Sequence, residues 1–149
     1  MAIYRRILLA VDLTEDSREI GARAREIAAE LGAEIEILHV IEPLPLMVAD
    51  APEVMAPAVL QTQDEIVRAA RVRVAALASD LGLAESAASV QLGNTQVEIV
   101  RMARERKADL IVLGSRERHG LSLLVDFTED AVLHKAPCDV LAVRVHPAA

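Results

Sequence analysis

Short apolar runs alternate along this chain with segments whose apolar residues recur at helical spacing. Arg6 to Asp12 reads RILLAVD, a continuous apolar run that ends at an acid, and later runs share its character. Runs of this kind are typical of strands buried on both faces of a parallel sheet. Their alternation with helices predicts a doubly wound α/β fold with helices on both faces of the sheet. The predicted strands are Arg6–Asp12, Glu34–Val40, Ala88–Leu92, Asp109–Leu113 and Asp139–Val145.

Capping patterns indicate where two of the helices begin. In a capping box, a residue with a short polar side chain is followed three positions later by glutamate, and each satisfies a backbone N–H of the first turn. Asp16 with Glu19 and Thr95 with Glu98 fit this pattern. We expect one helix from Asp16 to the stop at Gly32 and another from Thr95 to about Arg106, with further helices over Val59–Leu81 and Gly120–His134.

Four prolines interrupt the chain after the second predicted strand. They are Pro43, Pro45, Pro52 and Pro57, and no apolar periodicity connects them. Because proline lacks a backbone N–H and fixes φ, closely spaced prolines disfavour regular structure. We therefore expect residues 42–58 to form an exposed, mobile loop.

Composition excludes several classes of function. The 149 residues, 53% of them apolar, are enough for one domain over residues 1–149 with a real core. A net charge of -7 and a single Tyr and Phe leave neither a basic surface nor stacking platforms, so no nucleic-acid partner is expected. No apolar run is long enough to span a membrane, so a membrane is not expected as a partner. The lone Cys138 and the short apolar run at the start predict a cytoplasmic protein.

Polar residues follow two of the predicted strands. Ligands of doubly wound sheets bind beyond the carboxyl ends of strands, where the strand order reverses. If the first and fourth strands are neighbours, Asp12 and Leu13 face Gly114 and the residues after it across such a crevice. The stretch from Asp109 to Val145 runs from a strand through a glycine into a helix, which is how phosphate-binding turns are built. The four histidines have no metal-ligand spacing, and Ser115, Ser122 and Thr128 lack a predicted base, so neither a metal site nor a catalytic triad is expected.

Four segments cover nearly the whole chain in order: AVDLTEDS at the end of the first strand, HV closing the second, LGNTQVEIVRMARERKADLIVLGSRERHGLS, and the closing HKAPCDVLAVRV. Together they resemble the universal stress protein family. The resemblance implies a five-stranded parallel sheet of order 3-2-1-4-5, related to the adenine-nucleotide alpha-hydrolase architecture. It also implies a homodimer, and membership in either an ATP-binding or a nucleotide-free group.

The ATP-binding group is recognised by the motif G-x2-G-x9-G-[ST], which this chain matches only in part. Gly114 is the first glycine, Glu117 stands at the second, and Phe127 stands at the third, before Thr128. A register one residue shorter puts Asp126 at the third position and Phe127 at the hydroxyl position, so neither register supplies the glycine. Side chains of this size obstruct the backbone's approach to phosphate, and a carboxylate repels it. We therefore predict impaired ATP binding, although Mg²⁺ is able to bridge a carboxylate and a phosphate.

By the same resemblance, the adenosine side of the pocket is better preserved. Val11, Asp12, Leu13 and the backbone around Val40 occupy positions that hold adenine and ribose in the ATP-binding members. Gly114 and Ser115 would lie on the phosphate side together with Glu117, Phe127 and Thr128. The expected site therefore keeps the residues for an adenosine group and lacks those for the phosphates.

Three functions remain open at this point. The first is a non-catalytic, homodimeric stress-response module that binds protein partners and no cofactor, with Asp139 to Val145 forming the dimer edge. The second is a switch that binds AMP, ADP or ATP, with or without Mg²⁺. The third is a slow ATPase. The lost glycines favour the first.

Overall fold

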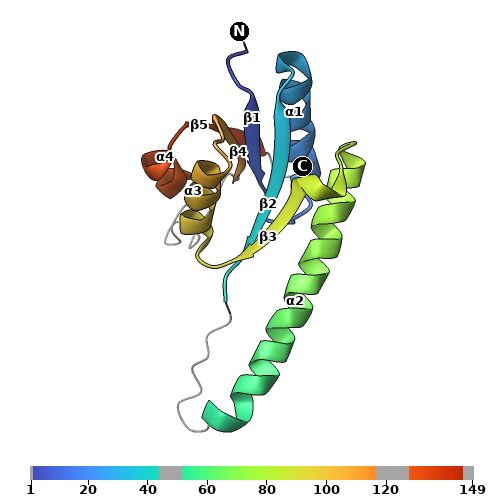
Figure 1. The fold of residues 1–149 in the computed structure, drawn as a ribbon, viewed down its shortest axis with the longest axis vertical. Coiled ribbons are helices and arrows are strands. Elements are labelled where there is room, and N and C mark those ends of the chain that lie inside the picture. Colours follow the sequence, from blue (N-terminus) through green and yellow to red (C-terminus); the bar gives the residue numbers. More distant parts are fainter. Residues whose placement is uncertain (1, 44–51, 117–127, 146–149) are drawn as a thin grey trace.

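The computed structural model describes residues 2–43, 52–116 and 128–145, which form a parallel sheet with helices on both faces (Figure 1). The strands are β1 (Arg6–Ala10), β2 (Glu34–Ile41), β3 (Ala88–Leu92), β4 (Leu110–Arg116) and β5 (Asp139–Val145). Their order across the sheet is β3-β2-β1-β4-β5, and all neighbouring strands run parallel. Both the fold class and the strand order expected from the sequence are confirmed.

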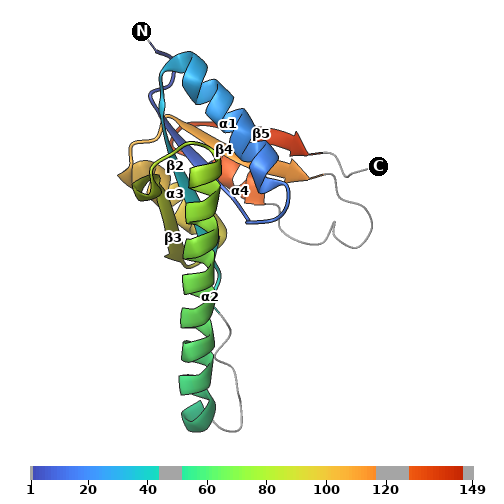
Figure 2. The same cartoon turned by 90° about the vertical axis from the view of Figure 1, so that its right-hand side faces the viewer.

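Each of the first four strands is followed by a helix that packs on the sheet. The helices are α1 (Ser17–Leu31), α2 (Pro52–Asp80), α3 (Thr95–Glu105) and α4 (Thr128–Lys135), and a 3-10 turn, η1 (Glu85–Ala87), precedes β3. Helices α1 and α2 cover one face of the sheet, and α3 and α4 cover the other (Figures 1 and 2). Two layers of apolar side chains therefore enclose the central strands.

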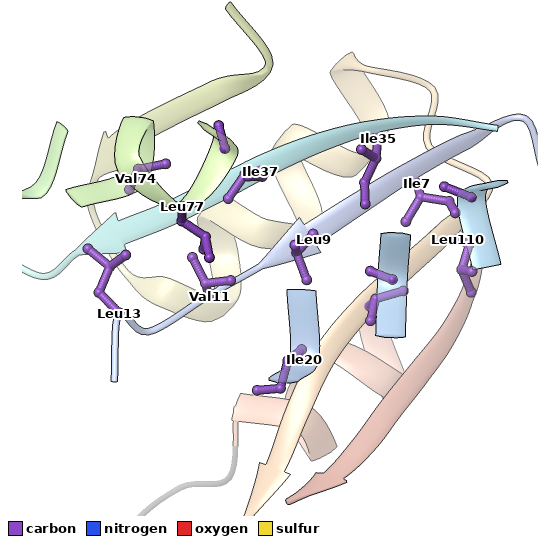
Figure 3. Close-up of a cluster of buried hydrophobic side chains, with 14 of the residues drawn as sticks. Ile7, Leu9, Val11, Leu13, Ile20, Ile35, Ile37, Val74, Leu77 and Leu110 are labelled. Carbon is purple, nitrogen blue, oxygen red and sulfur yellow. The ribbon is translucent and has the colours of Figure 1, made fainter. Parts of the chain in front are cut away.

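The central strands are apolar on both faces because both faces are buried. Every residue of β1 after Arg6 is buried, and its side chains alternate between the two core clusters. Ile7 and Leu9 pack toward α1 and α2, as Figure 3 shows, whereas Leu8 packs toward α3 and α4. This arrangement explains the continuous apolar run in the sequence.

The predicted loop over residues 42–58 is wrong at its carboxyl end, because α2 already begins at Pro52. Proline is tolerated in the first turn, where its missing N–H has no helical partner anyway. Pro57 lies inside the helix and removes one bond, yet the helix continues to Asp80. Residues 44–51 lie outside the described residues. The first half of α2 extends beyond the sheet (Figure 2).

Neither predicted capping box forms as expected. Asp16 is the residue before α1, but its side chain makes no capping hydrogen bond. Helix α3 is capped by Asn94, whose side chain accepts a hydrogen bond from the N–H of Val97, so Thr95 is already the first helical residue. Glu98 pairs with Arg101, and the backbone N–H of Thr95 donates to Glu42. The expected start of the last helix at Gly120 lies outside the described residues.

Candidate ligand-binding edge of the sheet

Six of the predicted site residues lie at the edge of the sheet formed by the carboxyl ends of β1, β2 and β4. They are Val11, Asp12, Leu13, Val40, Gly114 and Ser115. Ala10 of β1 pairs with Leu38, and Leu9 pairs with Val112. Continuing these registers places Asp12 level with Val40, and Val11 level with Gly114. The two sides of the expected crevice are therefore neighbours.

Three of these residues belong to the core through their side chains. Val11, Leu13 and Val40 are 7%, 8% and 8% exposed. Val11 and Leu13 pack toward α1 and α2 (Figure 3), whereas Val40 packs toward α3 and α4. Because the side chains are enclosed, contact with a ligand at these positions would use backbone groups.

Asp12 organises the loop between β1 and α1. Its Oδ1 accepts hydrogen bonds from the backbone N–H of Thr14 at 3.0 Å, from Thr14 Oγ1 at 2.7 Å and from Ser17 Oγ at 3.3 Å. A carboxylate that bonds the backbone two residues ahead is an Asx turn. Asp12 thus has a structural function in this loop, which a ligand would share.

Side chains from two other elements hold the backbone that leaves β1. His39 Nδ1 lies 2.8 Å from the carbonyl oxygen of Val11, and the Arg73 guanidinium of α2 donates to the carbonyl oxygen of Leu13. Leu13 has a φ of 59°, a left-handed conformation that is uncommon for a bulky residue. Such conformations persist where surrounding contacts enforce them. Contacts from β2 and α2 therefore fix the position of this loop.

Gly114 lies within β4 and does not begin a turn after it. It pairs with Val143 of β5, and Ser115 pairs with Arg144, so the strand continues past the expected end at Leu113 to Arg116. A Cβ atom on Gly114 would overlap Cδ1 of Ile20 from α1. The missing side chain therefore allows α1 to pack closely on β4.

The other predicted site residues follow β4 in the sequence. Glu117, Asp126 and Phe127 lie outside the described residues, and Thr128 is the first residue of α4. The sequence reasoning missed Thr14, Ser17, His39 and Arg73. The spacing from Asp12 to Thr14 is a recognisable Asx-turn pattern. The bonds of His39 and Arg73 depend on the packing of elements that are distant in sequence, so no local sequence pattern predicts them.

Within residues 2–43, 52–116 and 128–145, no three His, Cys, Asp or Glu side chains are arranged to hold a metal ion. Cys138 lies at the opposite end of the sheet, where partial burial, followed by the charges of Asp109 and Asp139, raises the pKa of its thiol. A raised pKa keeps the thiol protonated and weakly nucleophilic.

Within the part of the chain that the structure describes, no helix is both long enough and apolar enough to cross a bilayer.

Comparison with known proteins identifies relatives over nearly the whole chain. Residues 3–144 match the model of the universal stress protein family. Universal stress protein A homolog 2 of Coxiella burnetii is 34% identical over 143 residues, which are 95% of this chain and 96% of the relative. A universal stress protein of Thermus aquaticus is 32% identical and is covered over its full length.

Solved structures share the fold at lower identity. The universal stress protein UspA from Lactobacillus plantarum superposes with a TM-score of 0.67 at 23% identity, covering 95% of this chain and 98% of that one. A universal stress protein solved in complex with cAMP superposes with a TM-score of 0.55 at 21% identity, covering 94% and 96% of the two chains.

Proposed function

Because the chain belongs to the universal stress protein family, we propose that it acts as a non-catalytic, homodimeric stress-response module whose ATP binding is impaired. The observation that carries the proposal is the loss of glycines from the ATP motif, whose first position, Gly114, lies within β4. Two of the three glycines of the ATP motif are absent from the sequence, and α1 packs against the one that remains.

The substituted positions oppose phosphate in two ways. Glycine permits close approach of backbone N–H groups to phosphate, and Phe127, or Asp126 in the shorter register, removes that freedom. Glu117 adds a carboxylate, whose repulsion of a phosphate a few ångströms away is about 1 kcal/mol in water and several times larger at a partly buried site. Both effects weaken ATP binding while leaving the fold intact.

A nucleotide-dependent switch is the second candidate, and it is favoured by the well-held backbone at the carboxyl end of β1. The backbone of Val11 to Leu13 is held in place by Arg73 and His39, beside Val40, at the edge where ligands of such sheets bind. The cAMP complex of a structural relative lends this candidate support. Loss of phosphate contacts weighs more, so the switch and a slow ATPase rank below the binding module.

Calorimetric titration with ATP and Mg²⁺ tests the proposal. The repaired variants are Glu117→Gly with Phe127→Gly, and Glu117→Gly with Asp126→Gly and Phe127→Ser, which correspond to the two registers. We expect no measurable heat from the wild type at concentrations where one repaired variant saturates. Each restored hydrogen bond to phosphate contributes about 1.5 to 3 kcal/mol because the acceptor is charged. The variant that gains affinity identifies the register.

Other outcomes separate the candidates. Tight ATP binding by the wild type, or nucleotide recovered from the denatured purified protein, would overturn the impaired-binding proposal and favour the switch. Release of phosphate by the wild type would favour the ATPase. A folded repaired variant that still ignores ATP would show that the adenosine side is lost too.

Partners and location belong to the same proposal. We propose self-association through β5, an edge strand of the sheet, and function in the cytoplasm through protein partners. The proposed function requires no cofactor.

A further inference from the structure

A groove runs between α2 and β3, the strand at one side of the sheet. One cavity of about 360 Å³ is lined by Val74 and Ala75 of α2 and by Ala88 to Val90 of β3. A second of about 500 Å³ adjoins it and shares Ala75 and Glu85. Figure 1 shows β3 beside α2 at the edge of the sheet. Val74, Ala75 and Ala88 give the groove an apolar part that has room for small side chains.

The β3 edge offers unpaired backbone groups beside this groove. Gly93, just after the strand, donates its N–H inward to the carbonyl of Ile41 at 2.9 Å. Because consecutive N–H groups of a strand point to opposite sides, those of Leu92 and Val90 point outward, away from β2. Within the described residues, β3 pairs only with β2.

Features that usually protect an exposed edge are missing from β3. Its sequence, ASVQL, contains no charged residue and no proline. Natural edge strands are commonly protected by lysine, proline or a bulge, because bare edges pair with other chains. An edge that is both bare and flanked by a groove is suited to receive an extended segment.

Opposite charges flank the two ends of the groove. Glu85 precedes the amino end of β3, and both cavities reach it. Arg71 lies on the cavity side of α2, more than two turns before the helix ends, and therefore toward the carboxyl end of β3 because the chain reverses between α2 and β3. Both side chains are exposed, and neither pairs with another described residue. A partner with a base near Glu85 and an acid near Arg71 would complement them.

We propose that the groove between α2 and β3 binds an extended peptide segment of a partner protein by adding it as a strand beside β3. The backbone of the segment pairs with Val90 and Leu92, and alternate small apolar side chains enter the groove over Ala75. An acidic side chain of the segment pairs with Arg71 and a basic one pairs with Glu85. This inference rests on the proposed role as a protein-binding module and names the partner surface.

Two synthetic peptides provide the probe. Each has about seven residues, matching a short strand, and alternates valine with serine. One has lysine at its amino end and aspartate at its carboxyl end, and the other has these reversed, so that both strand directions are sampled. We expect one of them to bind the full chain with a Kd between about 10 µM and 1 mM, as fluorescence anisotropy measures. Hydrogen exchange at Val90 and Leu92 should slow on binding.

Variants of the protein and of the peptide separate strand addition from other binding. Val90→Pro removes an outward N–H without a bond to β2, and proline is tolerated at such edge positions. It should weaken binding at least about tenfold, equivalent to the loss of a well-formed hydrogen bond. Arg71→Glu should weaken binding about threefold or more, whereas Arg23→Glu, a charge reversal at an exposed position of α1, should leave it unchanged.

The peptide itself supplies a control that does not depend on folding of a variant. Methylation of its edge-facing backbone nitrogens should abolish binding to the wild type, because those nitrogens donate the pairing bonds. Binding that survives methylation, protection at sites other than β3, or no binding by either peptide at about 1 mM would overturn the proposal. None of these outcomes depends on ATP, so the calorimetric test of impaired nucleotide binding stands or fails separately.

Discussion

Gly114 allows a close approach between α1 and the sheet. The position that its Cβ would take is filled by Cδ1 of Ile20, a side chain that is 5% exposed. Its backbone needs no left-handed conformation, since it is regular strand paired with β5. The glycine that looks like part of a phosphate motif in the sequence therefore also has a packing function in the fold.

Gly114→Ala should destabilise the protein by about 1 to 3 kcal/mol, because the added methyl forces Ile20 or the strand to shift. Ile20→Val removes the Cδ1 methyl group and should itself cost about 0.5 to 1.5 kcal/mol. In the Ile20→Val background, the cost of Gly114→Ala should fall to less than about half, a coupling typical of residues in contact. Urea unfolding of the four proteins measures the cycle. Additive costs would show that the two residues do not compete for this space.

The start of α3 depends on one side chain, that of Asn94. Asn94→Ala should cost about 0.5 to 2 kcal/mol because it removes the acceptor that the N–H of Val97 uses. Asn94→Asp, which keeps an acceptor, should cost much less. Thr95→Ala should also cost less, since the Thr95 hydroxyl binds the exposed Glu42 and caps nothing. Denaturant unfolding compares the three, and a larger cost for Thr95→Ala would restore the capping box expected from the sequence.

The order and type of the elements were predictable because burial dictates them. Strands enclosed on both faces must be apolar throughout, and that pattern is visible in RILLAVD without a structure. The start of α2 was not predictable, since Pro52 and Pro57 argue locally for a loop. Pro52 instead occupies the first turn, where its missing N–H has no helical partner, and the helix continues into the later turns, where Ala70, Val74 and Leu77 pack in the core.

In the candidate site, too, some features were predictable from the sequence and others were not. The predicted residues Asp12, Val40 and Gly114 come together because strand order alone places them at one edge. The contacts that fix the edge, from Arg73 to the Leu13 carbonyl and from His39 to the Val11 carbonyl, join elements far apart in sequence. The effect of Glu117 and Phe127 stays a prediction that the ATP titration tests.

At the scale of the whole molecule, the sheet presents two edges with different surroundings. Strand β3 lies beside the groove along α2, whereas β5 carries apolar side chains on a more open edge, with Leu141 36% exposed and Val143 half-buried. A strand edge with exposed apolar side chains favours pairing with a second copy about a two-fold axis. The two edges are therefore expected to serve different partners, a second copy at β5 and a peptide segment at β3.

Leu141→Lys should weaken the homodimer by placing two like charges across the two-fold axis and removing apolar contact area. Because Leu141 lies at the surface, the change should leave the unfolding free energy of the monomer within about 0.5 kcal/mol. Sedimentation velocity at about 10 µM protein should show a dimer for the wild type and a monomer for Leu141→Lys. Val72→Lys on α2, where the valine is 70% exposed, is the matched control and should remain dimeric. A wild-type monomer at this concentration would refute self-association, and dissociation by Val72→Lys in place of Leu141→Lys would move the interface from β5 to the face that carries α2.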